Sequence, residues 1–149
     1  MDGTVDVSEK DRTLRRATAE SVLVATEQVV RDIRQNNLPK SDPLATARAA
    51  GLLAAKRTPD LIPHCHPVSL TDISFDFQLA DNSVIVLCRV TARERTGPEM
   101  EALCGASTAA LTLYDMIKGV CYGAEIERTR VIEKEGGKSG HWRREEDDS

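Results

Sequence analysis

The sequence has few aromatic residues and no long hydrophobic run. Aromatic side chains make up 3% of its 149 residues, so a core has to be built from alanine and aliphatic side chains. A membrane-spanning helix needs about 18 or more consecutive apolar residues, and the sequence contains no such run. The charged N-terminal segment also lacks the apolar stretch of a secretory signal. These absences predict a soluble cytoplasmic protein that does not bind a membrane.

An excess of positive charge is also missing. The net charge is −4 at pH 7, from 20 basic and 24 acidic residues, and the four acids at 145–148 account for all of it. The rest of the chain is neutral, which disfavours non-specific binding to nucleic acid. An anion site would therefore have to come from local clustering of lysine and arginine around a small molecule.

Closely spaced cysteine pairs are absent. The four cysteines lie at irregular intervals without a CxxC pair: Cys65, Cys88, Cys104 and Cys121. This pattern favours small core residues of a protein in a reducing compartment. The sequence therefore predicts four free thiols rather than a disulfide framework.

One loop concentrates two imidazoles and a thiol, in His64-Cys65-His66-Pro67. A zinc site usually takes about four ligands in CxxC or HxxxH spacing, which this loop does not offer. The sequence therefore predicts no metal site here. Two interpretations stay open: a solvent-facing loop histidine, or a functional histidine held by a proline-stiffened loop.

Length and periodicity indicate one domain. We expect a mobile N-terminal segment at 1–18, a single catalytic domain at 19–142 and a disordered acidic tail at 143–149. Apolar periodicity and turn residues predict, in chain order, a strand at 21–25, helices at 26–36 and 43–57, a hairpin of strands at 70–79 and 84–93, a helix at 97–121 and a strand at 124–133. This order predicts an α+β fold, similar to the ferredoxin-like arrangement, with helices on one face of an antiparallel sheet.

Asp115 and Lys118 are the most informative charged residues of the long helix. Their spacing of three places both side chains on one side of the helix. We expect the neighbouring Leu111, Tyr114 and Ile117 to desolvate them in part, which is typical of acid–base groups. From spacing alone, an ordinary surface ion pair is an equal alternative.

Other charged residues give weaker signals. Glu99 and Glu101 lie in the first helical turn, where the helix dipole favours carboxylates, and they point to different faces. The Gly136–Gly140 turn, with Lys138, lacks the glycine spacing of a phosphate-binding P-loop. It is either a solvated turn or a turn that presents a lysine to phosphate.

Four segments in order carry a family resemblance: VDVSEKDRTLRRA, LATARAAGLLAAKRTPDLIPHCHP, PEMEALCGASTAALTLYDMIK and EKEGGKSG. They resemble the cyclic pyranopterin monophosphate synthase family of molybdenum-cofactor biosynthesis, over about residues 5 to 141. The resemblance implies a lyase that converts a cyclised dihydro-GTP to cyclic pyranopterin monophosphate and releases pyrophosphate.

The resemblance also implies roles for individual residues. Asp115 and Lys118 match the catalytic pair of the family. The residues that match its substrate-binding positions are Lys10, Arg15, Lys40, His66, Glu99, Met100, Glu101 and Lys134. His64 stands where the family usually has leucine, and its role stays open.

The resemblance further implies a homohexamer, a trimer of dimers, that works after a radical GTP cyclase. No cofactor is expected, although Mg²⁺ could accompany the triphosphate. The alternatives are a non-catalytic nucleotide- or pterin-binding module, which would not need both Asp115 and Lys118, and a structural zinc protein.

Overall fold

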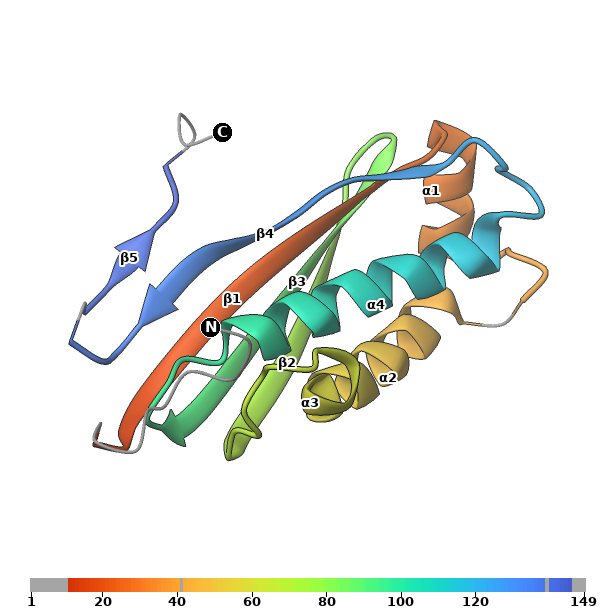
Figure 1. The fold of residues 1–149 in the computed structure, drawn as a ribbon. Coiled ribbons are helices and arrows are strands. Elements are labelled where there is room, and N and C mark those ends of the chain that lie inside the picture. The colour runs from red at the N-terminus through yellow and green to blue at the C-terminus, as the bar shows by residue number, and fades with distance from the viewer. Residues whose placement is uncertain (1–10, 41, 139, 146–149) are drawn as a thin grey trace.

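The computed structural model describes residues 11–40, 42–138 and 140–145, which form one antiparallel sheet covered by helices (Figure 1). The strands of the described chain are β1 (Thr13–Val24), β2 (Leu70–Leu79), β3 (Ser83–Glu94), β4 (Glu125–Glu135) and β5 (Trp142–Arg143), in the sheet order β2-β3-β1-β4-β5. The helices are α1 (Glu27–Gln35), α2 (Pro43–Lys56), α3 (Thr58–Leu61) and α4 (Glu99–Ile117). The α+β class is confirmed, and the ferredoxin-like arrangement is compatible with it.

Helix α4 runs across the sheet and organises the core. It contacts β1, β3 and β4, and α2 lies beside it on the same side of the sheet (Figure 1). Every second residue of β3 from Val84 to Ala92 is fully buried, and α4 meets the sheet with Ala102, Ala106 and Ala109. Alanines let the helix axis approach the sheet closely, which is how a chain with few aromatics fills its interior.

The contact between α2 and α4 depends on glycine. A Cβ atom on Gly51 would lie 2.8 Å from the Gly105 carbonyl oxygen and 2.6 Å from the Phe75 ring. A side chain at position 51 would therefore push the helices apart or displace Phe75. Small residues at this contact therefore allow the close packing of the two helices.

Strand β1 begins earlier than the sequence pattern indicates. We predicted a strand at 21–25 after a mobile segment at 1–18, whereas β1 starts at Thr13. The strand is central and hydrogen-bonds to β3 on one side and β4 on the other. Its charged residues find partners on those neighbours: Arg16 lies 3.4 Å from Glu135, and Glu20 lies 2.7 Å from Arg130. Apolar periodicity does not detect a strand whose charged residues are paired with neighbouring strands.

Capping residues fix the ends of the helices. Asp42 caps α2, because its side chain accepts a hydrogen bond from the Ala45 backbone N–H at 3.1 Å. Helix α2 ends at Lys56, next to the predicted end at 57, and Thr58-Pro59 begins the short helix α3, where no helix was predicted. The segment 62–69 follows and leads into β2. The strand pattern predicted for 70–79 is confirmed.

The C-terminal boundaries differ by a few residues from those predicted. Helix α4 ends at Ile117 rather than near 121, and β4 continues to Glu135. Arg143 lies in β5, opposite Glu133, although we assigned it to the disordered tail. Residues 146–149 lie outside the described chain. Among the described helices, none is long and apolar enough to cross a membrane.

Candidate active site

Three predicted site residues meet at the C-terminal end of α4. The Lys118 ammonium lies 2.8 Å from Asp115 Oδ1. Lys40, from the segment between α1 and α2, places its Nζ atom 3.9 Å from Asp115 Oδ2 and 3.4 Å from the Asp115 carbonyl oxygen. The tertiary structure thus brings Lys40 to a pair that the helix alone had formed.

The charges in this group stabilise each other. The hydrogen bond from Lys118, then the charges of Lys118 and Lys40, lower the pKa of Asp115. The same hydrogen bond and the Asp115 charge raise the pKa of Lys118. Asp115 is therefore a carboxylate able to accept a proton, beside two cations suited to phosphate.

The expected desolvation of this pair is absent within the described chain. The side chains of Asp115 and Lys118 are 59% and 53% exposed, and Leu111, which we expected to shield them, is itself 58% exposed. The reason is that α4 buries another stripe, which includes Leu113, Met116 and Ile117. Leu111 and the ion pair lie outside that stripe.

A second group of predicted residues lies at the N-terminal end of α4. Lys134, opposite Ala17 in the β1–β4 register, places its ammonium 2.5 Å from Glu99. Arg15 donates from Nε to the Glu94 carbonyl oxygen at 3.1 Å. Lys134 therefore reaches this end of the helix from β4, and Arg15, on the adjacent strand β1, reaches the end of β3 that leads to it.

The Arg15 side chain packs against the glycine-rich turn after β4. Gly137 has φ of +75°, and a Cβ atom there would lie 2.5 Å from Arg15 Nη1. Glycine is therefore required at position 137 for two reasons: the backbone conformation there, and the guanidinium packed against it. The sequence pattern found the turn but gave no sign of its contact with Arg15.

Glu101 is the buried member of the second group. Its residue is 2% exposed, and burial raises the pKa of its carboxyl to about 6. The Cys65 thiol lies 3.7 Å from Glu101 Oε2. His66 follows in the same loop and is half-buried, and Met100, next to Glu101, is 36% exposed. We predicted Cys65 to be a core residue, although its place in the histidine loop was a usable signal for a functional contact.

The two groups lie far apart within one chain. Glu99 and Asp115 are sixteen residues apart in α4, and at about 1.5 Å of rise per residue this separates them by about 24 Å. That distance exceeds the reach of side chains around one small substrate. Lys10, the remaining predicted residue, lies outside the described residues.

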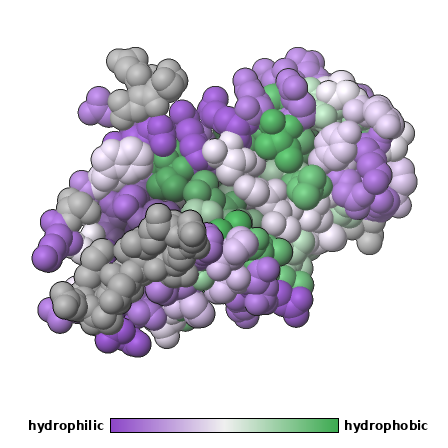
Figure 2. Space-filling view, viewed as in Figure 1, coloured by the Kyte–Doolittle hydropathy of each residue, from purple (hydrophilic) through white to green (hydrophobic). Residues whose placement is uncertain are grey.

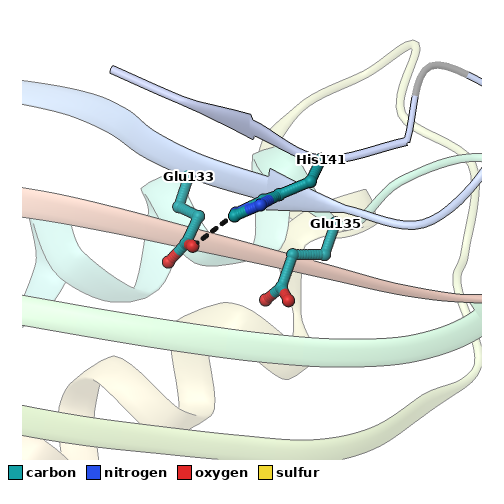
Figure 3. A group of neighbouring side chains, drawn as sticks. All are labelled: Glu133, Glu135 and His141. Atoms are coloured by element: carbon teal, nitrogen blue, oxygen red, sulfur yellow. Dashed lines mark hydrogen bonds and ion pairs between the residues drawn. The ribbon is translucent and has the colours of Figure 1, made fainter. Parts of the chain in front are cut away.

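A possible metal-binding group lies at the β4–β5 edge (Figure 3). One ligand atom each from Glu133, Glu135 and His141 lie within 4.8 Å of one another, and His141 Nε2 is 2.6 Å from Glu133. However, Arg143 lies 3.2 Å from Glu133, and Arg16 lies 3.4 Å from Glu135. Two guanidinium groups already neutralise these carboxylates and would oppose a divalent cation. We therefore interpret the group as an ion-pair network that fastens β5 to β4.

The fold and the charged groups define a class of protein. Clustered lysines and carboxylates on an α+β scaffold suit an enzyme that acts on an anionic small molecule. The chain belongs to the MoaC family, whose model matches residues 4–137.

Similar proteins carry one functional name. A Streptomyces avermitilis protein named cyclic pyranopterin monophosphate synthase is 52% identical over 140 residues, which cover 94% of this chain and 82% of that protein. A Mycobacterium tuberculosis protein named cyclic pyranopterin monophosphate synthase 2 is 51% identical, with 94% and 84% covered. A Pelobacter propionicus protein with the first of these names is 48% identical, with 95% and 90% covered. The family resemblance seen in the sequence is confirmed.

Proposed function

We propose that this chain is an enzyme of molybdenum-cofactor biosynthesis that converts cyclised dihydro-GTP to cyclic pyranopterin monophosphate and pyrophosphate. Relatives at 48–52% identity carry the name of this activity. The observation in the structure that carries the proposal is the contact of Lys40 and Lys118 with Asp115 at one end of α4. This contact places two cations that could bind phosphate beside a carboxylate that could accept a proton.

The reaction places two demands on the site. Closing the cyclic phosphate forms a bond between a substrate hydroxyl oxygen and the α-phosphorus, while the bond from that phosphorus to pyrophosphate breaks. The hydroxyl proton must pass to a base, and the leaving pyrophosphate needs positive charge. Asp115 suits the first task, and Lys118 and Lys40 suit the second. Rearranging the purine ring to a pterin requires further proton transfers, for which Glu101 is placed at the other end of the helix.

The proposed site is shared between chains. The two charged groups lie about 24 Å apart on one helix. A complete site would therefore combine one group of this chain with the other group of a partner chain. Apolar side chains on or beside α2 and α4 support such an assembly: Leu53, Leu61, Leu111 and Val120 are each more than half exposed. Figure 2 shows green apolar patches among purple on the face that these helices cover. The homohexamer implied by the resemblance, a trimer of dimers, would bury such a surface.

The proposed reaction also bears on the source of the substrate, the cellular compartment and the need for a cofactor. We propose that a radical GTP cyclase supplies the substrate and that both enzymes work in the cytoplasm, where the four free thiols of this chain would stay reduced. The conversion needs no redox cofactor, because ring rearrangement and phosphate closure call for proton transfers rather than an external oxidant. Mg²⁺ bound to the triphosphate would share the neutralising role of the lysines.

Pyrophosphate release tests the function directly. The chain is incubated with cyclised dihydro-GTP, and pyrophosphate and pterin product are both quantified. We expect one pyrophosphate per product, and a loss of both in Asp115→Asn and Lys118→Ala. Glu27→Gln and Arg31→Ala are matched controls, because that pair is also exposed and helical, with its atoms 4.0 Å apart. Tight binding of the substrate without pyrophosphate release would instead identify a non-catalytic binding module.

A further inference from the structure

The contact between Cys65 and Glu101 joins two parts of the fold. Glu101 lies in the first turn of α4, and its residue is 2% exposed. Cys65 lies in the loop after α3, with Sγ 3.7 Å from Glu101 Oε2 and 3.6 Å from the His66 carbonyl oxygen. A thiol hydrogen has two acceptors here, and the carboxylate is the stronger one because it carries charge. The loop thus places a side-chain donor against a buried acid.

The groups around this contact favour a protonated thiol. Burial, then the charge of Glu101 and its hydrogen bond, then Cys104, raise the pKa of the Cys65 thiol to about 11. Near neutral pH, Cys65 therefore keeps its hydrogen and donates it. It is neither a nucleophile nor a metal ligand in this state.

The same groups act on Glu101 in opposite directions. Burial raises the pKa of the Glu101 carboxyl, and the Glu99 carboxylate adds to this rise. The backbone N–H of Glu101 and the Cys65 thiol lower it by hydrogen bonding to the charged form. Lys134 pairs with Glu99 rather than with Glu101. Cys65 is therefore a side-chain donor, among the described residues, that supports the charged form of Glu101.

We propose that Cys65 is a positioning residue, whose thiol holds the Glu101 carboxylate ionised and fixed in orientation so that it can accept a proton from the substrate. The inference rests on the proposed function, because it assigns Glu101 a proton-transfer role in that reaction. It adds a residue that works through Glu101 without touching the substrate through its side chain. It also gives the cysteine a role that serine can fulfil and alanine cannot.

The contact is tested first by thiol reactivity, without substrate. Cys65 alkylation by iodoacetamide is followed by peptide mass spectrometry across pH 7 to 10. In Glu101→Gln, the thiol loses a negative neighbour and a charged acceptor, so its pKa falls and alkylation at pH 8 becomes faster, by about three- to tenfold. Glu99→Gln is the matched control, because that carboxylate faces Lys134. An unchanged Cys65 rate in Glu101→Gln overturns the proposal.

The positioning role is tested by the pH dependence of turnover in Cys65→Ala and Cys65→Ser. Loss of the donor in Cys65→Ala raises the pKa of Glu101, so the acidic limb of the kcat profile moves to higher pH. Cys65→Ser keeps a donor, so its profile stays close to that of the wild type. A uniform loss at every pH in Cys65→Ala, or no rescue by serine, means that the residue is only structural and overturns the proposal.

The two experiments separate this inference from the proposed function. If the wild-type chain releases no pyrophosphate, the proposed function fails, and the positioning role fails with it even where alkylation reveals the contact. If the wild type turns over and the Cys65→Ala profile does not move, the positioning role alone is wrong. Melting temperatures of all variants confirm that each protein compared is folded.

Discussion

The Lys118 ammonium lies 2.8 Å from the Asp115 carboxylate, and both side chains are more than half exposed. Helical spacing brings the two residues together, and no tertiary contact is needed for it. Water screens an exposed pair of this kind, so it adds little to folding. The role that we propose for the pair is therefore catalytic rather than structural.

Asp115→Asn and Lys118→Ala should separate catalysis from stability. We expect kcat to fall by about 100-fold or more in each, because acid–base groups act mainly in the transition state. The melting temperature should stay close to that of the wild type, because the pair is exposed. Calorimetry and single-turnover assays on the same samples provide the measurement. Unfolding of both variants would assign the pair a structural role instead.

Lys40→Ala should weaken substrate binding more than it slows the chemical step. Its ammonium lies 3.9 Å from Asp115. Unlike Lys118, it comes from the segment between α1 and α2 rather than from the end of α4. Because salt screens attraction to the triphosphate, the loss should be largest at low ionic strength and shrink as salt rises. Titration calorimetry at two salt concentrations measures this. Arg34→Ala, at an exposed position in α1, is the control, and an equal loss in both variants would contradict a phosphate role for Lys40.

Gly137→Ala should displace Arg15, whereas Gly140→Ala should not. Both glycines have positive φ, so each alanine carries backbone strain of about 1–2 kcal/mol. The Cβ atom meets Arg15 only at position 137, since nothing lies within 4 Å of the Cβ atom built at Gly140. We therefore expect similar losses of stability but a raised KM in Gly137→Ala alone. Equal KM values would show that Arg15 does not bind substrate.

Glu101→Gln should alter how stability depends on pH. The folded-state pKa of this acid is raised from 4.5 to about 6, so the folded protein binds the proton more tightly than the unfolded chain. The resulting stabilisation is fully present below pH 4.5 and is lost as pH rises through about 6, a difference of about 2 kcal/mol. Glutamine stays neutral, so its variant should lack this decline. Melting curves from pH 4 to 7 measure this decline, and Glu27→Gln, at an exposed position in α1, is the control. Parallel curves for the wild type and Glu101→Gln would contradict the assignment.

Leu111→Glu should break the proposed assembly. Leu111 is 58% exposed on α4, and a charge there would be costly in an apolar interface. Light scattering of the wild type should give a mass near six subunits of 16.3 kDa, and the variant should give a smaller one. Gln28→Glu, on the exposed face of α1, is the control. A variant of unchanged mass would place the interface elsewhere.

Local signals in the sequence predicted most of the elements. Apolar periodicity predicted β2 at 70–79, and periodicity with turn residues predicted the start of α2 at 43. Strand β1 was predicted too short, because its buried positions include the small residues Ala17, Ala19 and Ser21, and its charged residues depend on partners in β3 and β4. The four-residue helix α3 was missed, because proline marks the end of one helix and the first turn of another equally well.

The sequence by itself determined the family, the secondary structure in outline, and the Asp115–Lys118 pair, since all three depend on motifs or on spacing within one segment. Only the tertiary structure decided that Lys40 joins this pair, that Lys134 faces Glu99, that Arg15 rests on Gly137, and that Cys65 donates to Glu101. Each of these contacts joins segments distant in the chain. The packing of α4 on the sheet determines which residues meet, and no periodicity in one segment encodes the position of another.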